Sequence, residues 1–498
     1  MPNATDHRAD FCRGPAGERR LLAAVAGLAL LLAGCSATLP TGSTTAALPE
    51  APKQAADISP AQTREHQRIL AAYNGGYDDP RLEAALNQTV EKLVAASDRP
   101  DLHYRVTILN SPAINAFALP NGQLYVTRGL IALANDTSEL ASVLAHEMAH
   151  VIAQHAEIRE ERAKRVALVG RVFGDLGADP ELGALAMAKS KIALASFSRA
   201  QEFEADGIGV GIAARSGFDP YGAVRFLAEM GRSGELKSAS QAAINPRAPD
   251  FLSSHPATPE RVKNAQTVAR QFSAPGAGER DRTAYLEVID GMVYGEDPSE
   301  GFVRGRRFLH PKLGFTFVAP EGFSLDNSAE AVLGVKEGGG QALRMDVVRV
   351  PAEQKLGEYL NSGWIENIEA KSVEELTLNG LPAATATAKG DQWAFRLFAV
   401  RFGSDVYRFI YATKRMTPEI DRAFRESVGT FRRMTLAEMK AAKPLHLKVV
   451  SVAEGDTVEK LASRMVVPDR AVERFRVLNG LGPTDRLTVG DAVKIVVE

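Results

Sequence analysis

The sequence has little of what several classes of protein require. Only two of its 498 residues are cysteines, Cys12 and Cys35, and both precede the first segment with a folded pattern. The globular part therefore has neither a disulfide framework nor a thiolate metal site. Lys and Arg total 59 against 61 for Asp and Glu, so the basic excess of a nucleic-acid-binding protein is missing and we expect no nucleic-acid partner.

Long apolar runs are equally scarce, and the one candidate lies near the start of the sequence. Residues 21–33 follow Arg19-Arg20 and are too few for a comfortable membrane span, which is typical of a signal peptide. The run closes on Leu-Ala-Gly-Cys and resembles a bacterial lipobox, which implies lipidation of Cys35. Because Ser36 follows, the resemblance implies an outer-membrane anchor facing the periplasm. The alternative is an uncleaved N-terminal anchor.

A single helix is predicted to carry the chemistry. Asp136 gives an N-cap signal with Glu139 three residues later, and apolar residues continue at helical spacing to Ile152. His146 and His150 are four residues apart, so both imidazoles leave one face of this helix and can bind one metal ion. The geometry suits zinc, and a pair of buried structural histidines is the alternative.

Four motifs occur in the order found in one family of zinc metallopeptidases. The chain resembles the family that includes HtpX, BepA, the mitochondrial Oma-type proteases and the CAAX prenyl endopeptidases, over about residues 65 to 270. The matching motifs are Asn-Ala-Phe-Ala-Leu-Pro-Asn-Gly (115–122), His-Glu-Met-Ala-His (146–150), Ser-Arg-Ala-Gln-Glu-Phe-Glu-Ala-Asp (198–206) and His-Pro-Ala-Thr-Pro-Glu-Arg (255–261).

The resemblance implies one Zn²⁺ per chain, bound by His146, His150 and Glu202. This set agrees with the three protein ligands and one open position that catalytic zinc requires. Glu147 would be the general base, because a metal-activated water can pass its proton to a neighbouring carboxylate. Asp206, one turn after Glu202, could orient a ligand histidine from behind.

The last motif and the first complete the predicted site. His255 is implied either as an oxyanion donor or as a residue that approaches the metal and keeps the enzyme latent; the simpler alternative is that it starts a helix. Arg261 would contact Glu202 from behind. On a continuous helix His155 points away from the metal face, and we interpret it as a surface or buried polar residue. The edge strand that would pair with substrate backbone is Asn115, Ala116, Phe117 and Ala118.

Two further units follow the metallopeptidase motifs. Residues 307–436 combine strand candidates at 343–350, 394–400 and 407–413 with a helical pattern at 419–430, and they distantly resemble PsbP-like α/β sandwiches. The last unit, with Glu454-Gly455-Asp456-Thr457, resembles a LysM module. That resemblance implies a βααβ fold and possible peptidoglycan binding, the alternative being a LysM-shaped partner domain.

We therefore predict an α+β multidomain protein. Its mainly helical zincin-type metallopeptidase domain has a small edge sheet and is followed by a sandwich-like α/β domain and a βααβ LysM-like domain. The predicted boundaries are a lipoprotein signal peptide (1–34), a flexible tether (35–59), the metallopeptidase domain (60–272), a linker (273–306), the accessory domain (307–436) and the LysM-like domain (446–498).

The functional hypothesis is a zinc-dependent endopeptidase of the bacterial cell envelope. Its predicted substrates are unfolded, misfolded or misassembled envelope proteins, and it would reach the membrane through lipidated Cys35. Two alternatives stay open at this point. One is a chaperone or assembly factor with a latent zinc site in which His255 fills the fourth position, and the other is a peptidoglycan-binding protein positioned by residues 446–498.

Overall fold

The computed structural model describes residues 60–161, 164, 197–239, 254–327, 331–363 and 367–498. The predicted signal peptide, the predicted tether and Cys35 lie outside the described residues. Among the helices that are described, none is long and apolar enough to cross a membrane. The described chain is mixed α and β, with a helical first part followed by parts rich in sheet.

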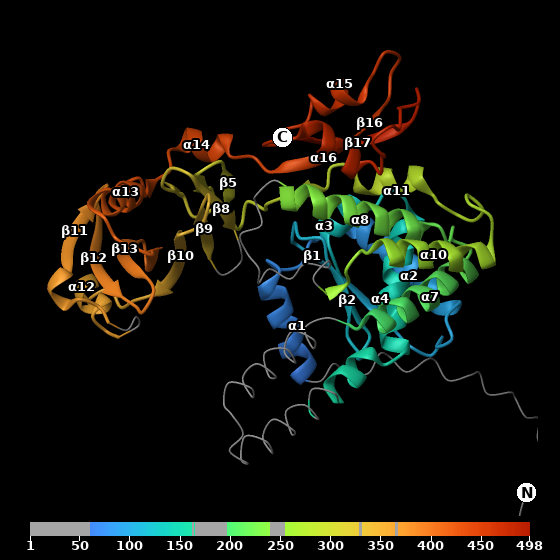
Figure 1. Ribbon diagram of the computed structural model, residues 1–498, viewed down its shortest axis with the longest axis horizontal. Helices are drawn as coiled ribbons and strands as arrows, with labels where there is room; N and C mark the ends of the chain where they lie inside the picture. The colour runs from blue at the N-terminus through green and yellow to red at the C-terminus, as the bar shows by residue number, and fades with distance from the viewer. Residues whose placement is uncertain (1–59, 162–163, 165–196, 240–253, 328–330, 364–366) are drawn as a thin grey trace, which may run out of the picture. The chain divides into compact units, whose positions relative to one another are not determined.

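In the first part of the chain, the described residues between 60 and 289 are mainly helical (Figure 1). Its described helices are α1 (Pro60–Ala72), α2 (Pro80–Ala95), α3 (Arg128–Leu133), α4 (Thr137–Ile152), α7 (Arg199–Arg215), α8 (Gly222–Ala239), α10 (Pro259–Phe272) and α11 (Arg282–Ile289). Its strands are β1 (Arg105–Leu109), β2 (Ala116–Ala118) and β3 (Gln123–Thr127). They form one sheet in the order β1-β3-β2, with β1 parallel and β2 antiparallel to β3, so β2 is an edge strand.

Helix α4 lies at the centre of this part. Asp136 caps it by accepting a hydrogen bond from the Glu139 backbone N–H at 3.0 Å. Every residue from 138 to 150 is buried, so the helix is covered on all faces. Helix α7 packs closely on it at Gly209, where a Cβ atom would lie 3.0 Å from the His146 backbone N. The glycine therefore lets α7 bring its acidic side chains up to the histidines of α4.

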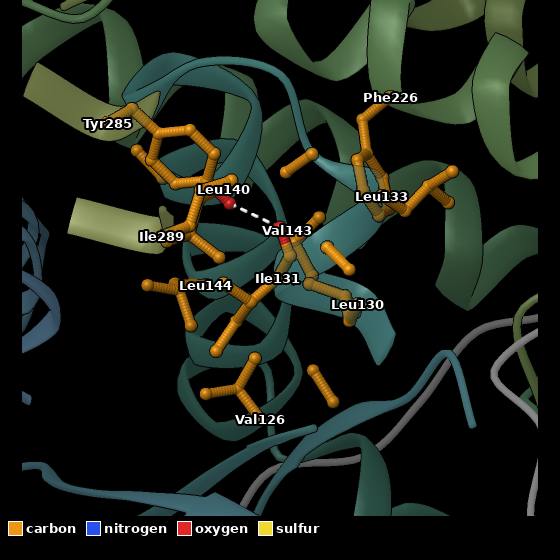
Figure 2. Packing of buried hydrophobic residues seen from close by; sticks show 14 of the residues in the cluster. Val126, Leu130, Ile131, Leu133, Leu140, Val143, Leu144, Phe226, Tyr285 and Ile289 are labelled. Atoms are coloured by element: carbon orange, nitrogen blue, oxygen red, sulfur yellow. Dashed lines mark hydrogen bonds between the residues drawn. The ribbon is translucent and has the colours of Figure 1, made fainter. Parts of the chain in front are cut away.

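The apolar core surrounds the N-terminal half of α4. Figure 2 shows Leu140, Val143 and Leu144 packing against side chains from α3 and α11, with the Tyr285 hydroxyl donating to the Ile131 carbonyl at 2.6 Å. Residues 282–289 belong to the predicted linker 273–306, yet they form α11 and bury Tyr285, Leu286 and Ile289. The Pro-Gly-rich sequence at 275–278 suggested a boundary, but the apolar residues after it return the chain to the same core.

The accessory domain lies in sequence between two strands that pair with each other. Strand β4 (Val293–Tyr294) pairs antiparallel with β16 (Leu445–Ser451), and Tyr294 is the partner of Leu445. The two ends of the segment between these strands are therefore close together. It contains β5 (Phe302–Arg304), β6 (Arg307–His310), β7 (Phe315–Val318), β8 (Phe323–Asn327), β9 (Val332–Lys336), β10 (Gln341–Arg349), α12 (Leu356–Leu360), η1 (Ala370–Ser372), β11 (Glu374–Leu378), β12 (Leu381–Lys389), β13 (Ala394–Phe402), β14 (Asp405–Thr413), α13 (Pro418–Gly429), β15 (Arg432–Arg433) and α14 (Leu436–Ala441).

The accessory domain has its own cores. Seven strands form one sheet in the order β11-β12-β13-β14-β10-β9-β8, and four form a second in the order β15-β7-β6-β5. An aromatic cluster that includes Phe317, Phe409 and Phe424 is separate from the core around α4, as is a smaller aliphatic cluster beside α12. This domain is therefore an insertion that does not share the core of the first part.

The C-terminal unit, in contrast, shares that core. It has the order β16, α15 (Val458–Ala462), α16 (Ala471–Leu478) and β17 (Ala492–Val497), which is the predicted strand-helix-helix-strand order. The LysM assignment itself stays a prediction. Leu447, Phe475 and Val496 belong to the same apolar cluster as the side chains around α4. The Lys494 ammonium is fully buried and donates to the carbonyls of Ala132 and Ala134, each at 2.7 Å.

Candidate active site

The two histidines of α4 meet on one face, as their spacing requires. His146 and His150 place their Nε2 atoms 3.1 Å apart, and both side chains are buried. The carboxylate of Glu202 lies 3.5 Å from His146 Nε2 and 3.7 Å from His150 Nε2. Glu202 is positioned by the start of α7, where Ser198 and Gln201 form a capping box that fixes the first turn of the helix.

These separations fit a tetrahedral metal site. Bonds of about 2.0–2.1 Å to histidine nitrogen and carboxylate oxygen place two tetrahedral ligand atoms about 3.3–3.4 Å apart. The observed distances of 3.1, 3.5 and 3.7 Å lie around that value. With His255, these residues form a group whose ligand atoms all lie within 4.8 Å of one another. The donor set is therefore suited to one metal ion, and nitrogen with carboxylate oxygen is a set that zinc accepts.

Acidic and basic groups behind the donor set hold it in place. Asp206 Oδ1 lies 3.1 Å from His146 Nδ1, on the side of the ring away from the other ligands. The Arg261 guanidinium binds both Asp206 oxygens, at 2.6 and 2.8 Å, and approaches Glu202 Oε2 at 2.7 Å. Thr258 caps α10 by accepting from the Arg261 backbone N–H, which orients this first turn. A carboxylate that accepts a hydrogen bond from a ligand histidine in this way fixes the rotamer and the tautomer of the ring.

His255 lies inside the site rather than at its edge. Its Nδ1 is 2.9 Å from Glu202 Oε1 and 3.3 Å from His146 Nε2. Its Nε2 is 3.8 Å from Glu147 Oε1. One ring nitrogen therefore faces the donor set and the other faces Glu147. Its Nδ1 is thus placed as a fourth metal ligand would be, and its Nε2 as an oxyanion donor would be.

Glu147 is next to the donor set but outside it. The side chain is buried, and its Oε1 has no hydrogen-bond partner among the described residues. Burial raises the pKa of Glu147, while His255 and His146 oppose the rise. A buried carboxylate with an unpartnered oxygen beside a metal site is positioned to accept a proton from water.

A groove connects these groups with the edge strand. A cavity of about 320 Å³ is lined by β2 and by Glu147, His150 and His255. Asn115 lies just before the strand. Its side-chain amide donates to the Tyr73 hydroxyl at 2.7 Å, and its backbone N–H donates to the Thr127 hydroxyl at 3.0 Å. The predicted edge residues Ala116, Phe117 and Ala118 form β2 and line this cavity. An extended peptide in the groove would lie between the strand and Glu147.

The ionisation of the ligands follows from their neighbours. Burial disfavours a charged His146, but hydrogen bonds to Asp206 and Glu202 outweigh it and raise its pKa to about 9. Burial lowers the pKa of His150 well below its usual range, and the neighbouring His146 adds to this effect. Burial raises the pKa of Glu202, yet its hydrogen bonds to His146 and His255 lower it below the usual range.

Metal binding is therefore expected to release one proton, from His146. Without metal, the raised pKa keeps His146 protonated at neutral pH, whereas His150 is already neutral and Glu202 already ionised. Because a metal must displace this proton, the apparent affinity should fall about tenfold for each pH unit below about 9. Calorimetric titration with Zn²⁺ at pH 7.5, in two buffers with different ionisation enthalpies, measures the number of protons released.

Asp206→Asn is the matched variant for this prediction. It removes the main group that raises the His146 pKa, so the proton release at pH 7.5 should drop towards zero. An unchanged proton count in this variant, or no release from the wild-type protein, would contradict the assignment of the proton to His146.

Three residues at the site were not identified from the sequence. His155 was expected to point away from the metal face, but its Nδ1 lies 2.9 Å from His150 Nδ1. Glu204, which the sequence left without a role, lies 3.3 Å from His155 Nε2. Phe197 stacks on the His150 ring, with centroids 4.0 Å apart and planes 24° apart. The only available signal was their position near the motifs, which does not define side-chain direction.

Comparison with known proteins agrees with this geometry. Residues 80–269 match the model of Peptidase family M48. This range begins at α2 and includes the edge strand, both ligand-bearing helices and Arg261. The relatives include the beta-barrel assembly-enhancing protease of Yersinia pestis, 33% identical over 44% of this chain and 45% of that protein. The protein of the same name from Escherichia coli K12 is 31% identical over 39% of this chain and 40% of its own length.

A second group of relatives is mitochondrial. The mitochondrial metalloendopeptidase OMA1 of Schizosaccharomyces pombe is 28% identical over 36% of this chain and 51% of that protein. The matches thus span about half or less of the relatives' own lengths. Among solved structures, the cyanobacterial PsbP of Synechocystis aligns with 28% of this chain and 98% of its own, at 13% identity and a TM-score of 0.21. Residues 80–269, which contain the cluster of His146, His150, Glu202 and His255, thus match Peptidase family M48.

Proposed function

We propose that this chain is a zinc-dependent endopeptidase of the bacterial cell envelope. The observation that carries the proposal is the arrangement of His146, His150 and Glu202 around one point, with Glu147 beside them at the wall of an open groove. Three protein ligands that leave a position for water are typical of a catalytic zinc site. The M48 family match supports the same chemistry.

The residues of the chain would divide the reaction among them. A divalent metal in this donor set supplies Lewis acidity to the substrate carbonyl and lowers the pKa of water. Glu147 takes the proton of the attacking water and later delivers it to the leaving amine. His255 donates from Nε2 to the developing oxyanion, since this nitrogen faces Glu147 rather than Glu202. Strand β2 aligns the substrate by backbone hydrogen bonds.

This recognition mode favours unfolded substrates. Backbone pairing with an edge strand requires an extended peptide and reads little of its sequence. Folded proteins seldom offer such a segment, whereas misfolded or misassembled ones do. The relatives named beta-barrel assembly-enhancing proteases support envelope proteins as the substrates.

Chelator-dependent cleavage of an unstructured protein tests the proposal. We expect the purified chain to cut such a substrate internally, to stop when a chelator removes the metal, and to recover on addition of one equivalent of Zn²⁺. Cleavage that continues in the metal-free protein would refute the mechanism. Recovery with another metal but not with Zn²⁺ would refute the choice of ion.

A second candidate is an assembly factor with a closed metal site. It is favoured by His255 Nδ1, which lies as close to Glu202 and His146 as the other ligand atoms lie to one another. His255→Ala distinguishes the two candidates. If His255 is the fourth ligand of an inactive site, the variant should cleave faster than the wild type; if His255 stabilises the oxyanion, the variant should cleave more slowly. An absence of cleavage in both proteins would favour the assembly factor.

We also propose attachment to the envelope at two places. A lipid on Cys35 would anchor the chain in the outer membrane facing the periplasm, and residues 446–498 would bind peptidoglycan. Cys35→Ser should release the protein from the membrane fraction, which fractionation measures. Co-sedimentation of the full chain with purified peptidoglycan tests the second contact, and absence of the protein from the pellet would refute it.

A further inference from the structure

The chain changes direction immediately after the metal-binding helix. Helix α4 ends at Ile152, and Gln154 adopts a left-handed conformation with φ of 53°. A new helical segment then runs from 155 to 161. On a continuous helix, five residues correspond to a rotation of about 500°, which would place His155 about 140° away from His150. The break at Gln154 instead returns the His155 ring to His150.

The His155 ring is buried and lies within hydrogen-bond distance of one side chain on each side. His155 is only 1% exposed, and its ring meets that of His150 edge-on with centroids 4.9 Å apart. Its Nδ1 lies 2.9 Å from His150 Nδ1, and its Nε2 lies 3.3 Å from Glu204 Oε2. Both nitrogens of the ring therefore have a partner, and the three side chains form a continuous chain of contacts.

One arrangement of protons satisfies this chain of contacts. The Nε2 atom of His150 points toward His146 and Glu202, where the metal would bind. In the neutral ring, the proton is therefore on Nδ1. That N–H donates to Nδ1 of His155, which must then be the acceptor. His155 carries its own proton on Nε2 and donates it to the Glu204 carboxylate. Each contact then has one donor and one acceptor.

Helix α7 thereby supports both metal-binding histidines. Asp206 contacts His146 directly at 3.1 Å. Glu204 lies two residues from Glu202, about 200° around the helix, so it cannot face the metal ligands itself. Its side chain is 58% exposed, and His155 spans the gap between it and His150. The two ligand histidines therefore receive the same kind of support, one directly and one through a second imidazole.

We propose that His155 is a positioning residue for the metal site, which holds the His150 ring and, with Glu204, fixes its tautomer. This inference rests on the proposed metal-binding function of His150, but not on peptidase activity. Removing support of this kind from a ligand histidine typically costs 10–100-fold in metal affinity.

Metal affinity in three variants of the full chain tests the proposal. Competition for Zn²⁺ with a chromophoric chelator should show binding about 10–100-fold weaker in His155→Phe, which keeps a ring but loses both nitrogens. His155→Asn should recover most of the loss, because its side-chain oxygen can accept the His150 proton at a similar position. A smaller loss is expected for Glu204→Gln, since Glu204 is largely exposed.

A matched control separates positioning from general damage. His310→Phe replaces another buried histidine, 7% exposed and located in the accessory domain, and should leave the affinity unchanged. Co²⁺-substituted protein provides a second readout, because the absorption bands of the metal should shift in His155→Phe but not in His310→Phe. Unchanged affinity and bands in His155→Phe would overturn the proposal even if cleavage is normal. A wild-type protein that binds Zn²⁺ without cleaving peptides would refute only the peptidase function.

The tautomers can be observed without any substitution. Long-range ¹H–¹⁵N spectra of the zinc-loaded protein, labelled at histidine, should show His150 with its proton on Nδ1 and His155 with its proton on Nε2. If His155→Phe fails to fold, this measurement alone decides the matter. A proton on Nδ1 of His155 would overturn the proposed arrangement.

Discussion

Glu147→Gln is expected to lower kcat/KM for peptide cleavage by about 10³-fold or more while Zn²⁺ stays bound. Loss of a general base costs about 10²–10⁴-fold, and a factor of 10³ corresponds to about 4 kcal/mol of activation free energy. The amide keeps the shape of the side chain but cannot accept the proton. Because the metal-ligand atoms come from other residues, the metal content should not change.

The same substitution should not destabilise the fold. The Glu147 carboxylate is buried, and burial raises its pKa, so its charge opposes folding rather than favouring it. A neutral amide removes this cost. Steady-state kinetics, metal analysis and thermal unfolding of one preparation test all three expectations.

Glu287→Gln is the control for this experiment, since Glu287 is an exposed glutamate on α11 outside the site. It should behave as the wild type in every assay. Wild-type rates in Glu147→Gln would refute the role of Glu147, and loss of metal would place Glu147 among the ligands. If the variant is inactive but loaded, it can also retain substrates for identification by mass spectrometry.

The local features of the site could be predicted from the sequence because they depend on short-range geometry. The four-residue spacing of His146 and His150 places both on one helical face, and the structure has them there. Asp206 and Glu202 are likewise one turn apart, and both reach the histidines. Predicted strands at 343–350, 394–400 and 407–413 correspond to β10, β13 and β14, whose β-branched and aromatic residues give a clear strand signal.

Features that depend on a break in a helix, or on residues with little preference for strand, were not predicted from the sequence. The direction of His155 was deduced from an unbroken helix, and nothing in the sequence around Gln154 required a left-handed residue. Strand β12 was missed because it buries alanines, among them Ala383, Ala384 and Ala386, which carry little strand preference. Its position is set by the neighbouring strands β11 and β13 rather than by its own residues.

Local sequence patterns could not reveal that the C-terminal unit packs into the core around α4. Deleting this unit is expected to have a large effect on the stability of the fold. We expect a chain ending at residue 444 to lose at least about 5 kcal/mol of stability, or to fail to fold. Leu447, Phe475 and Val496 belong to the core around α4, and burying each such side chain contributes about 1.5–3 kcal/mol. Domains of this size have only about 5–15 kcal/mol of net stability.

Polar contacts add to this loss. Without Lys494, the carbonyls of Ala132 and Ala134 lose their ammonium donor. The predicted loss of 5 kcal/mol corresponds to a fall in Tm of at least about 10 °C. Thermal unfolding followed by circular dichroism, with Zn²⁺ affinity measured in parallel, tests the deletion.

Removing the accessory domain provides the matched comparison, although it removes more residues. Tyr294 and Leu445 are already paired, so a short Gly-Ser linker can replace residues 299–442 and close a hairpin between β4 and β16. The aromatic and aliphatic clusters of the accessory domain are separate from the core around α4, so Tm should change by only a few degrees and Zn²⁺ affinity should be retained. If instead the chain ending at 444 folds with wild-type metal affinity, the C-terminal unit is an independent module and its shared core contributes little to the metal site.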